Sequence, residues 1–175
     1  KSMTKFKKIA LSFGLLISSL SFGQTTNCND PLTNICGDVG LDFVAQIGVP
    51  EASVTNPTNN YGCLSSSPNP TWYFMETSAS GDMDFELNAA SDIDFIVYGP
   101  FSDYAAAQSG CGTYGQSGGA PIVDCSYSGT NQETPSITGA VIGDIYVMLV
   151  TNYANSVQNI TFEQVGGTGN TDCLS

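Results

Sequence analysis

Basic side chains are almost absent from this 175-residue sequence, whose formal net charge is −12. It has no histidine, and its only basic residues are Lys1, Lys5, Lys7 and Lys8. Beyond them no side chain can form a Lys Schiff base, activate a Ser or Cys nucleophile as His does, clamp phosphate as Arg does, or bind zinc through His. All sixteen Asp and Glu follow residue 29, so the body of the chain has no side-chain ion pairs.

The lysines belong to an expected export signal. Positive residues at 5–8 precede an apolar run, Ile9–Leu20, and then Ser21–Gly23, whose small residues suit signal peptidase. The apolar run is shorter than the roughly 20 residues of a transmembrane span. We therefore expect residues 1–23 to be removed, leaving one domain over 24–175 with no membrane anchor.

Removal of the signal leaves the carboxylates unopposed. Such a negative surface repels nucleic acid and anionic lipid, which bind through Lys and Arg. We expect the partner to be a protein or a glycan at the cell surface. Carboxylates that repel one another also attract divalent cations, and oxygen ligands favour Ca²⁺ over zinc.

Six cysteines follow the signal: Cys28, Cys36, Cys63, Cys111, Cys125 and Cys173. An even number in an exported chain predicts three disulfides, for which 15 connectivities exist. We favour Cys111–Cys125, because a Gly-rich loop between them closes at low entropic cost. The other pairings stay open, with Cys28–Cys173 as one option that would join the termini.

Alternating hydrophobicity predicts a β structure. Residues 82–87 place Met83, Phe85 and Leu87 on one face and three carboxylates on the other. Four further strands are expected at Thr71–Met75, 92–98, 144–150 and 157–165, with the last two forming a hairpin through the turn 152–156.

One short helix is expected at 104–108, capped by Ser102 or Asp103 and ended by Gly110. The predicted fold is all-β: a single β-sandwich of jelly-roll or CUB-like type with one short helix, stapled by disulfides. Trp72, the one tryptophan, is expected in its core.

Four segments resemble a known family: YGCLSSSPNPTWYFMET (61–77), DIDFIVYGPFSDY (92–104), PIVDCSYS (121–128) and the stretch 144–173. Together they resemble an N-terminal β-sandwich module of Bacteroidetes gliding-motility-associated surface adhesins, which the type IX secretion system exports. The resemblance implies an extracellular or outer-surface module without enzymatic activity. Members of the family usually continue to a sorting domain. We therefore expect the chain to be the N-terminal piece of a longer protein, or periplasmic if it ends at Ser175.

Paired acidic residues are the candidate metal ligands. Asp92 and Asp94 share one face of a strand, and Asp82, Asp84 and Glu86 on the preceding strand could converge with them on Ca²⁺. The alternatives are a solvated face that opposes edge aggregation and turn caps that accept backbone N–H bonds. The chain has no DxDxDG loop, which is the specific calcium signal.

Two classes of function follow. Paired carboxylates are also what glycosidases use, but a strand meets their spacing easily, so we predict no catalytic residues and no enzyme. We predict a surface module that acts by binding or by spacing; the alternative is a calcium-dependent carbohydrate-binding domain. Tyrosines expected in loops suit either class, although most should be half-buried lids: Tyr61, Tyr104, Tyr114, Tyr127 and Tyr153.

Overall fold

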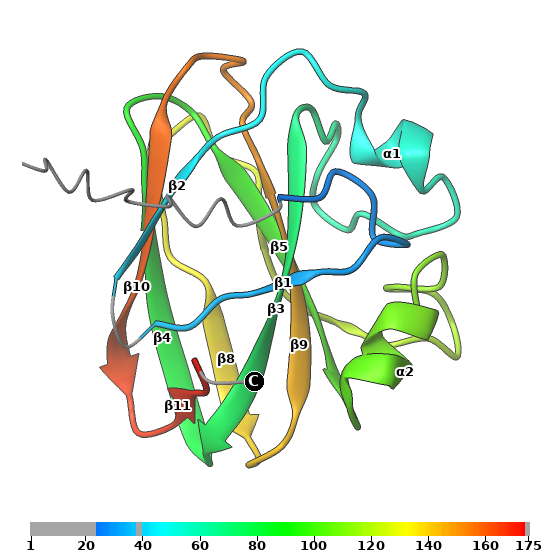
Figure 1. Ribbon diagram of the computed structural model, residues 1–175, viewed down its shortest axis with the longest axis vertical. Coiled ribbons are helices and arrows are strands. Elements are labelled where there is room, and N and C mark those ends of the chain that lie inside the picture. Colours follow the sequence, from blue (N-terminus) through cyan, green and yellow to red (C-terminus); the bar gives the residue numbers. More distant parts are fainter. Residues whose placement is uncertain (1–23, 38–39, 174–175) are drawn as a thin grey trace, which may run out of the picture.

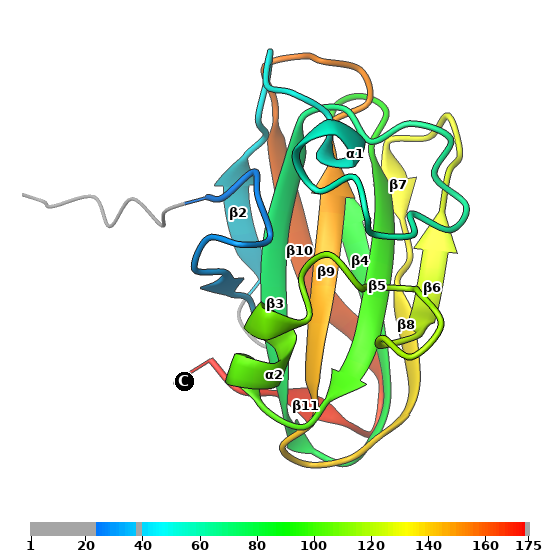
Figure 2. The same ribbon diagram turned by 90° about the vertical axis from the view of Figure 1, so that its right-hand side faces the viewer.

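The computed structural model describes residues 24–37 and 40–173, which form two packed β-sheets (Figure 1). The predicted cleavage site and the segment before it lie outside the described residues. Both helices cover the outer face of one sheet, and no helix among the described residues lies on the other sheet (Figures 1 and 2). The predicted all-β sandwich is confirmed, with a second short helix that the sequence did not indicate.

One sheet has six strands, in the order β1-β3-β9-β5-β6 with β11 also paired to β3. All its pairs are antiparallel except β1 with β3. Its strands are β1 Thr33–Asn34, β3 Pro70–Ala79, β5 Asp94–Phe101, β6 Ile122–Ser126, β9 Ile145–Thr151 and β11 Asn170–Thr171.

The other sheet has five strands, in the order β2-β10-β4-β7 with β8 also paired to β4. All its pairs are antiparallel. Its strands are β2 Leu41–Val44, β4 Gly81–Asn88, β7 Gln132–Glu133, β8 Ser136–Ala140 and β10 Asn159–Gly167.

The six-stranded sheet is buried on both faces. Its inner face packs on the five-stranded sheet, through residues such as Phe95 and Met148. Its outer face carries a second core beneath the helices, where Trp72 is fully buried with its ring 6.2 Å from that of Tyr98 and 5.9 Å from that of Tyr114. Burial on both faces explains why β3, β5 and β9 read as continuous apolar runs, and the expected core position of Trp72 is confirmed.

The five-stranded sheet keeps one face toward solvent. In β4, Met83, Phe85 and Leu87 are fully buried while Asp82 and Asp84 are exposed, as the alternation predicts. In β10, Ile160 and Phe162 are buried between exposed neighbours in the same way.

The predicted hairpin between β9 and β10 is wrong, because the two strands belong to different sheets. The connecting loop crosses the end of the sandwich and is held by Asn152, whose side-chain amide donates to the Gln46 and Ser156 carbonyls at 2.9 and 2.8 Å. Gln158 Nε2 donates to Asn152 Oδ1 at 2.8 Å. These bonds replace the tight turn that a hairpin would need.

The two helices are short. The expected helix is confirmed as α2, Tyr104–Ser109, with the Asp103 carboxylate accepting from the Ala106 N–H at 2.7 Å and Gly110 at its end. The unpredicted helix is α1, Ala52–Thr55, a single turn that buries Ala52. A helix this short leaves little periodic signal, so its packing holds it in place.

Three disulfides join all six cysteines, as the even number predicts: Cys28–Cys111, Cys36–Cys173 and Cys63–Cys125. The favoured pair Cys111–Cys125 is wrong, and so is the optional Cys28–Cys173. The Gly-rich loop turns back on itself, with the Gly115 N–H donating to the Ala120 carbonyl at 2.8 Å, but this turn does not join Cys111 to Cys125. The loop also packs on the one that precedes β3, where the Asn60 N–H donates to the Tyr114 carbonyl at 2.8 Å.

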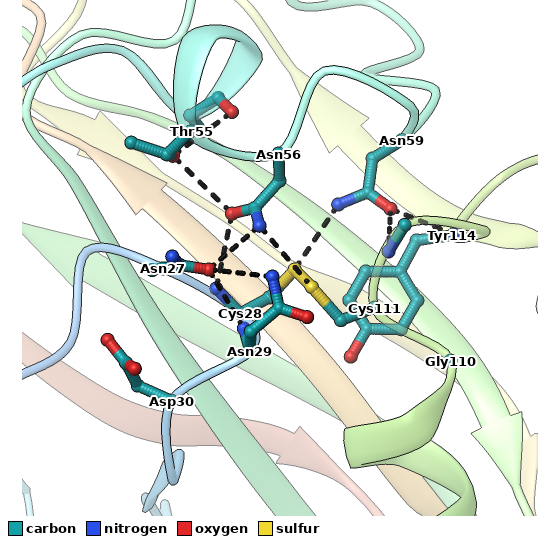
Figure 3. The surroundings of a disulfide bond; sticks show 12 residues. Asn27, Cys28, Asn29, Asp30, Thr55, Asn56, Asn59, Gly110, Cys111 and Tyr114 are labelled. Atoms are coloured by element: carbon teal, nitrogen blue, oxygen red, sulfur yellow. Dashed lines mark hydrogen bonds between the residues drawn. A yellow bond between two sulfur atoms is a disulfide. The ribbon is translucent and has the colours of Figure 1, made fainter.

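Asparagines surround the Cys28–Cys111 disulfide (Figure 3). Asn59 Nδ2 donates to Cys28 Sγ at 3.4 Å, and Asn56 Nδ2 donates to Cys111 Sγ at 3.5 Å. Asn56 Oδ1 also accepts from the Cys28 N–H at 3.2 Å. The bridge and these amides together fasten three loops over the outer core.

Three disulfides indicate an oxidising compartment, either extracellular or periplasmic. Within 24–37 and 40–173, no helix has the length and apolar character that a membrane crossing requires.

Candidate binding site at one end of the sandwich

A hollow of about 190 Å³ lies at the end of the six-stranded sheet where β5 begins and where β6 and β9 end. In Figure 2, β5 begins and β9 ends near the top of the view. Antiparallel pairing brings these three strand ends together. The residues that line it are Asp92, Asp94, Tyr127, Ser128, Gly129 and Tyr153. Of the predicted metal ligands, the hollow therefore contains Asp92 and Asp94.

Asp94 is the most buried carboxylate of the hollow. It is the first residue of β5, is 1% exposed, and lies opposite Thr151 of β9. Its Oδ1 accepts from the Ser128 N–H at 3.0 Å, whereas its Oδ2 is buried without a hydrogen-bond partner. The Thr151 hydroxyl is likewise buried without a bond of good geometry. A buried acceptor that lacks a donor costs about 1–3 kcal/mol.

Asp92 lies two residues before Asp94, in the loop that enters β5. It is half-buried, and its Oδ1 is inaccessible and unpartnered. Its carbonyl accepts from the Ala154 N–H at 3.1 Å, which ties this loop to the loop of Tyr153. Gln158 Oε1 supports the same arrangement by accepting from the Ser91 N–H at 2.7 Å.

A third carboxylate, Glu133 of β7, lies behind the hollow and is 4% exposed. Its Oε1 accepts from the Ser128 hydroxyl at 2.7 Å and from the Thr130 hydroxyl at 3.4 Å. Ser128 therefore contacts two buried carboxylates, one through its backbone and one through its side chain. Nothing in the local sequence pattern indicated Glu133 or Thr151, because both reach the site through strand pairing.

The electrostatics of the hollow disfavour ionised carboxylates. The pKa of Asp94 is raised to about 7, with burial as the largest cause and the charges of Asp92 and Glu133 acting in the same direction. Donation from the Ser128 N–H and from the Thr151 hydroxyl acts in the opposite direction. Burial also raises the pKa of Asp92. No Lys, Arg or His follows residue 8, so the chain has no basic side chain in the described part to offset these charges.

Two tyrosines form the exposed rim of the hollow. Tyr127 follows β6 and Tyr153 follows β9, and they are 37% and 42% exposed. Their rings meet edge to face with centroids 5.6 Å apart. The Tyr127 hydroxyl lies 3.3 Å from the Ser66 hydroxyl. The other loop tyrosines are structural: Tyr114 is fully buried, and Tyr61 and Tyr104 are half-buried.

Asp82, Asp84 and Glu86 do not converge with Asp92 and Asp94. They lie on the solvent face of the other sheet, where Asp82 accepts from the Gly139 N–H at 2.7 Å and Asp84 from the Ser136 hydroxyl at 2.8 Å. Glu86 accepts from the Gln132 amide at 2.6 Å. Across residues 24–37 and 40–173, no three Asp, Glu or Cys side chains gather as metal ligands would. The predicted five-carboxylate site is therefore wrong, and what is left of it is the Asp92–Asp94 pair.

Comparisons with known proteins add no identity. No protein-family model matches the chain, and no curated protein matches it at a significant level.

Proposed function

We propose that this chain is a secreted or cell-surface, non-catalytic module that acts by binding a partner through the hollow at the end of the sandwich. The observation that carries the proposal is the exposed Tyr127–Tyr153 pair above the two carboxylates. Tyrosine supplies a large contact area at low entropic cost and is enriched in binding surfaces. The three disulfides support a role outside the cytoplasm.

The sequence resemblance supports a place in a larger adhesin. The segments 61–77, 92–104, 121–128 and 144–173 are those that resemble the gliding-motility-associated surface proteins exported by type IX secretion. Two of them end or begin at the hollow, since they contain Asp92, Asp94 and Tyr127. In such a protein the module would bind a partner at the outer cell surface or act as a spacer there.

A glycan is the partner class that we propose to test first. Tyrosine rings offer flat apolar faces, and carboxylates are strong acceptors for sugar hydroxyls. The second candidate function, a calcium-dependent carbohydrate-binding domain, is favoured by the unpartnered oxygens of Asp92 and Asp94 in the same hollow.

The experiment is a glycan array probed with the oxidised protein, with and without chelator. Tyr127→Ala with Tyr153→Ala should reduce binding at least tenfold. Ile142→Ala is the matched control, because Ile142 is 66% exposed beyond the opposite end of β9. Binding that survives the tyrosine double variant would place the partner elsewhere. A blank array would remove the glycan and leave a protein partner or a spacer, which cross-linking on intact cells would separate.

A further inference from the structure

We propose that the hollow at the end of the six-stranded sheet is a divalent-cation site, with Ca²⁺ as the preferred ion and with the carboxylates of Asp92 and Asp94 as the protein's direct ligands. The inference deepens the proposed binding function, since the cation would lie beneath the Tyr127–Tyr153 rim. It rests on the geometry of that hollow and not on any glycan being bound.

The first argument is the bonding of Asp94. One of its oxygens is held by the Ser128 N–H at 3.0 Å, which orients the carboxylate. The other makes no hydrogen bond of good geometry, although the Thr151 hydroxyl favours the ionised carboxylate, and the side chain is 1% exposed and lines the hollow. Buried polar atoms in folded proteins nearly always have a partner. A cation in the hollow would supply the one that this oxygen lacks.

The second argument is that the neighbouring carboxylate of Asp92 also has an oxygen without a hydrogen bond. Asp92 Oδ1 is also buried and unpartnered, and so is the hydroxyl of Thr151, the cross-strand neighbour of Asp94. Two carboxylate oxygens without a hydrogen bond therefore belong to residues at one place in the fold, beside the Thr151 hydroxyl, which acts on Asp94. One cation would satisfy the two carboxylates together, and the Thr151 hydroxyl oxygen is a third candidate ligand.

The third argument is charge. The charges of Asp92 and Glu133, in and behind the hollow, repel that of Asp94. No lysine, arginine or histidine follows residue 8, so the counter-charge has to come from solution. The exposed acids of β4 differ, because each has a donor from a neighbouring residue.

The dimensions and chemistry of the hollow favour calcium. A water molecule takes roughly 30 Å³ in the liquid, so a volume of about 190 Å³ accommodates an ion with several bound waters. Calcium accepts six to eight oxygens in irregular geometry and tolerates a site completed by water. Magnesium demands a tighter octahedron, and zinc prefers nitrogen or sulfur, neither of which the hollow offers.

The competing account is that Asp94 is simply protonated. A neutral carboxyl group would relieve the repulsion and donate a hydrogen bond itself. A protonated Asp94 would bind no cation, so calcium would then have no effect on the stability of the protein. The two accounts are therefore separable by direct measurement.

The experiment measures calcium binding to the oxidised protein by calorimetry and by thermal unfolding, in chelated buffer at pH 8. Calcium at a hundredfold excess over Kd should raise the melting temperature by about 5–10 °C. Magnesium should raise it less. Sodium chloride at matched ionic strength should not reproduce the shift, because screening acts mainly on exposed charges.

The matched variants locate the site. Asp92→Asn with Asp94→Asn should abolish both the heat of binding and the calcium shift. Asp82→Asn with Asp84→Asn removes the same charge from the exposed face and should leave both unchanged. If the first double variant does not fold, Asp92→Asn alone should weaken binding at least tenfold, since its side chain is only half-buried.

Any of three results would overturn the proposal: no heat of binding, a shift that sodium reproduces in full, or a shift that survives in the Asp92/Asp94 variant. Failure here is distinct from failure of the glycan proposal. Calcium binding with a blank glycan array would leave the cation site standing alone. Chelator-insensitive glycan binding without calcium binding would leave the binding module standing without its ion.

Discussion

The chain contains two Asp-x-Asp pairs ten residues apart, and the two pairs differ in their exposure to solvent and in their hydrogen bonding. Asp82 and Asp84 lie on the solvent face of β4, and each accepts a hydrogen bond from β8. Asp92 and Asp94 lie at the start of β5, where each has a buried oxygen without a donor. Alternation specifies which residues share a face, but the environment of that face is set by the neighbouring strands.

The difference comes from the positions of the two strands. β4 belongs to the sheet whose outer face is open, whereas β5 runs between β9 and β6 in the sheet that is covered on both faces. A carboxylate at the start of β5 therefore loses water, and one on β4 keeps it. The predictions below test this contrast in order of expected effect.

Charge reversal at the second position of each pair should give the largest contrast. Asp94→Lys places a long cationic side chain where the native residue is 1% exposed, and should cost about 3 kcal/mol or more. Asp84→Lys changes an exposed residue and should stay within about 1 kcal/mol. Urea unfolding of the oxidised proteins measures both. Equal losses would mean that the two positions are equally exposed in solution.

Neutralisation should stabilise only the buried pair. In chelator at pH 8, Asp94→Asn should raise the unfolding free energy by about 1–2 kcal/mol, because it removes repulsion and its new Nδ2 donor has unpartnered acceptors in Asp92 and Thr151. Its Oδ1 can still accept from Ser128. Asp84→Asn should change the free energy by less than about 0.5 kcal/mol. Destabilisation by Asp94→Asn would show that the ionised group has a partner.

The pH dependence should follow from Asp94. Its pKa is raised to about 7 in the folded state, whereas an unfolded Asp titrates near 3.9. The protonated form therefore favours the fold fully below about pH 4, and this stability is lost as the pH rises through about 7. In chelator, the melting temperature of the native protein should fall between pH 4 and pH 7. The fall should be no larger than the rise in melting temperature that Asp94→Asn produces at pH 8.

The same titration in the two Asn variants provides the comparison. Asp94→Asn should flatten the profile between pH 4 and pH 7, and Asp84→Asn should keep it. A melting temperature that rises across this interval in the native protein would contradict the repulsion argument, since paired carboxylates produce that sign.

Added salt should have the smallest effect on the unfolding free energy, and it should distinguish least between the two Asp pairs. Sodium chloride screens the exposed carboxylates of β4 more than the buried pair. It should stabilise the native protein by less than about 1 kcal/mol, and by the same amount in the Asp92→Asn/Asp94→Asn variant. A smaller gain in that variant would mean that salt reaches the hollow.

The regular parts of this fold could be predicted from local sequence. The alternation of Met83, Phe85 and Leu87 identified β4 and its buried face, and the Asp103 cap identified α2. Local patterns work here because each face or cap is decided within one element. The sequence between β9 and β10 predicts a hairpin turn that the fold does not contain, because a crossing between sheets and a tight turn have the same polar composition.

The site could be predicted only in part. The sequence predicts that Asp92 and Asp94 lie together where a strand begins, but Thr151 and Glu133 join them through strand register and packing. The disulfide pairing could not be predicted either, because it also depends on contacts between segments that are distant in the sequence. Loop length favours a bridge across the Gly-rich loop, but the hydrogen bond of Asn60 to Tyr114 packs that loop against the one before β3.

The disulfide between Cys36 and Cys173 has a mechanical consequence. The two cysteines are 137 residues apart in the chain, and every strand from β2 to β11 lies between them. Tension applied to residues 24 and 173 passes across this covalent bond and does not reach the enclosed strands. An unfolded segment of that length would extend by about 450–490 Å. Under oxidising conditions the domain therefore transmits a pulling force without unfolding the strands that the bridge encloses, and reduction would remove that property.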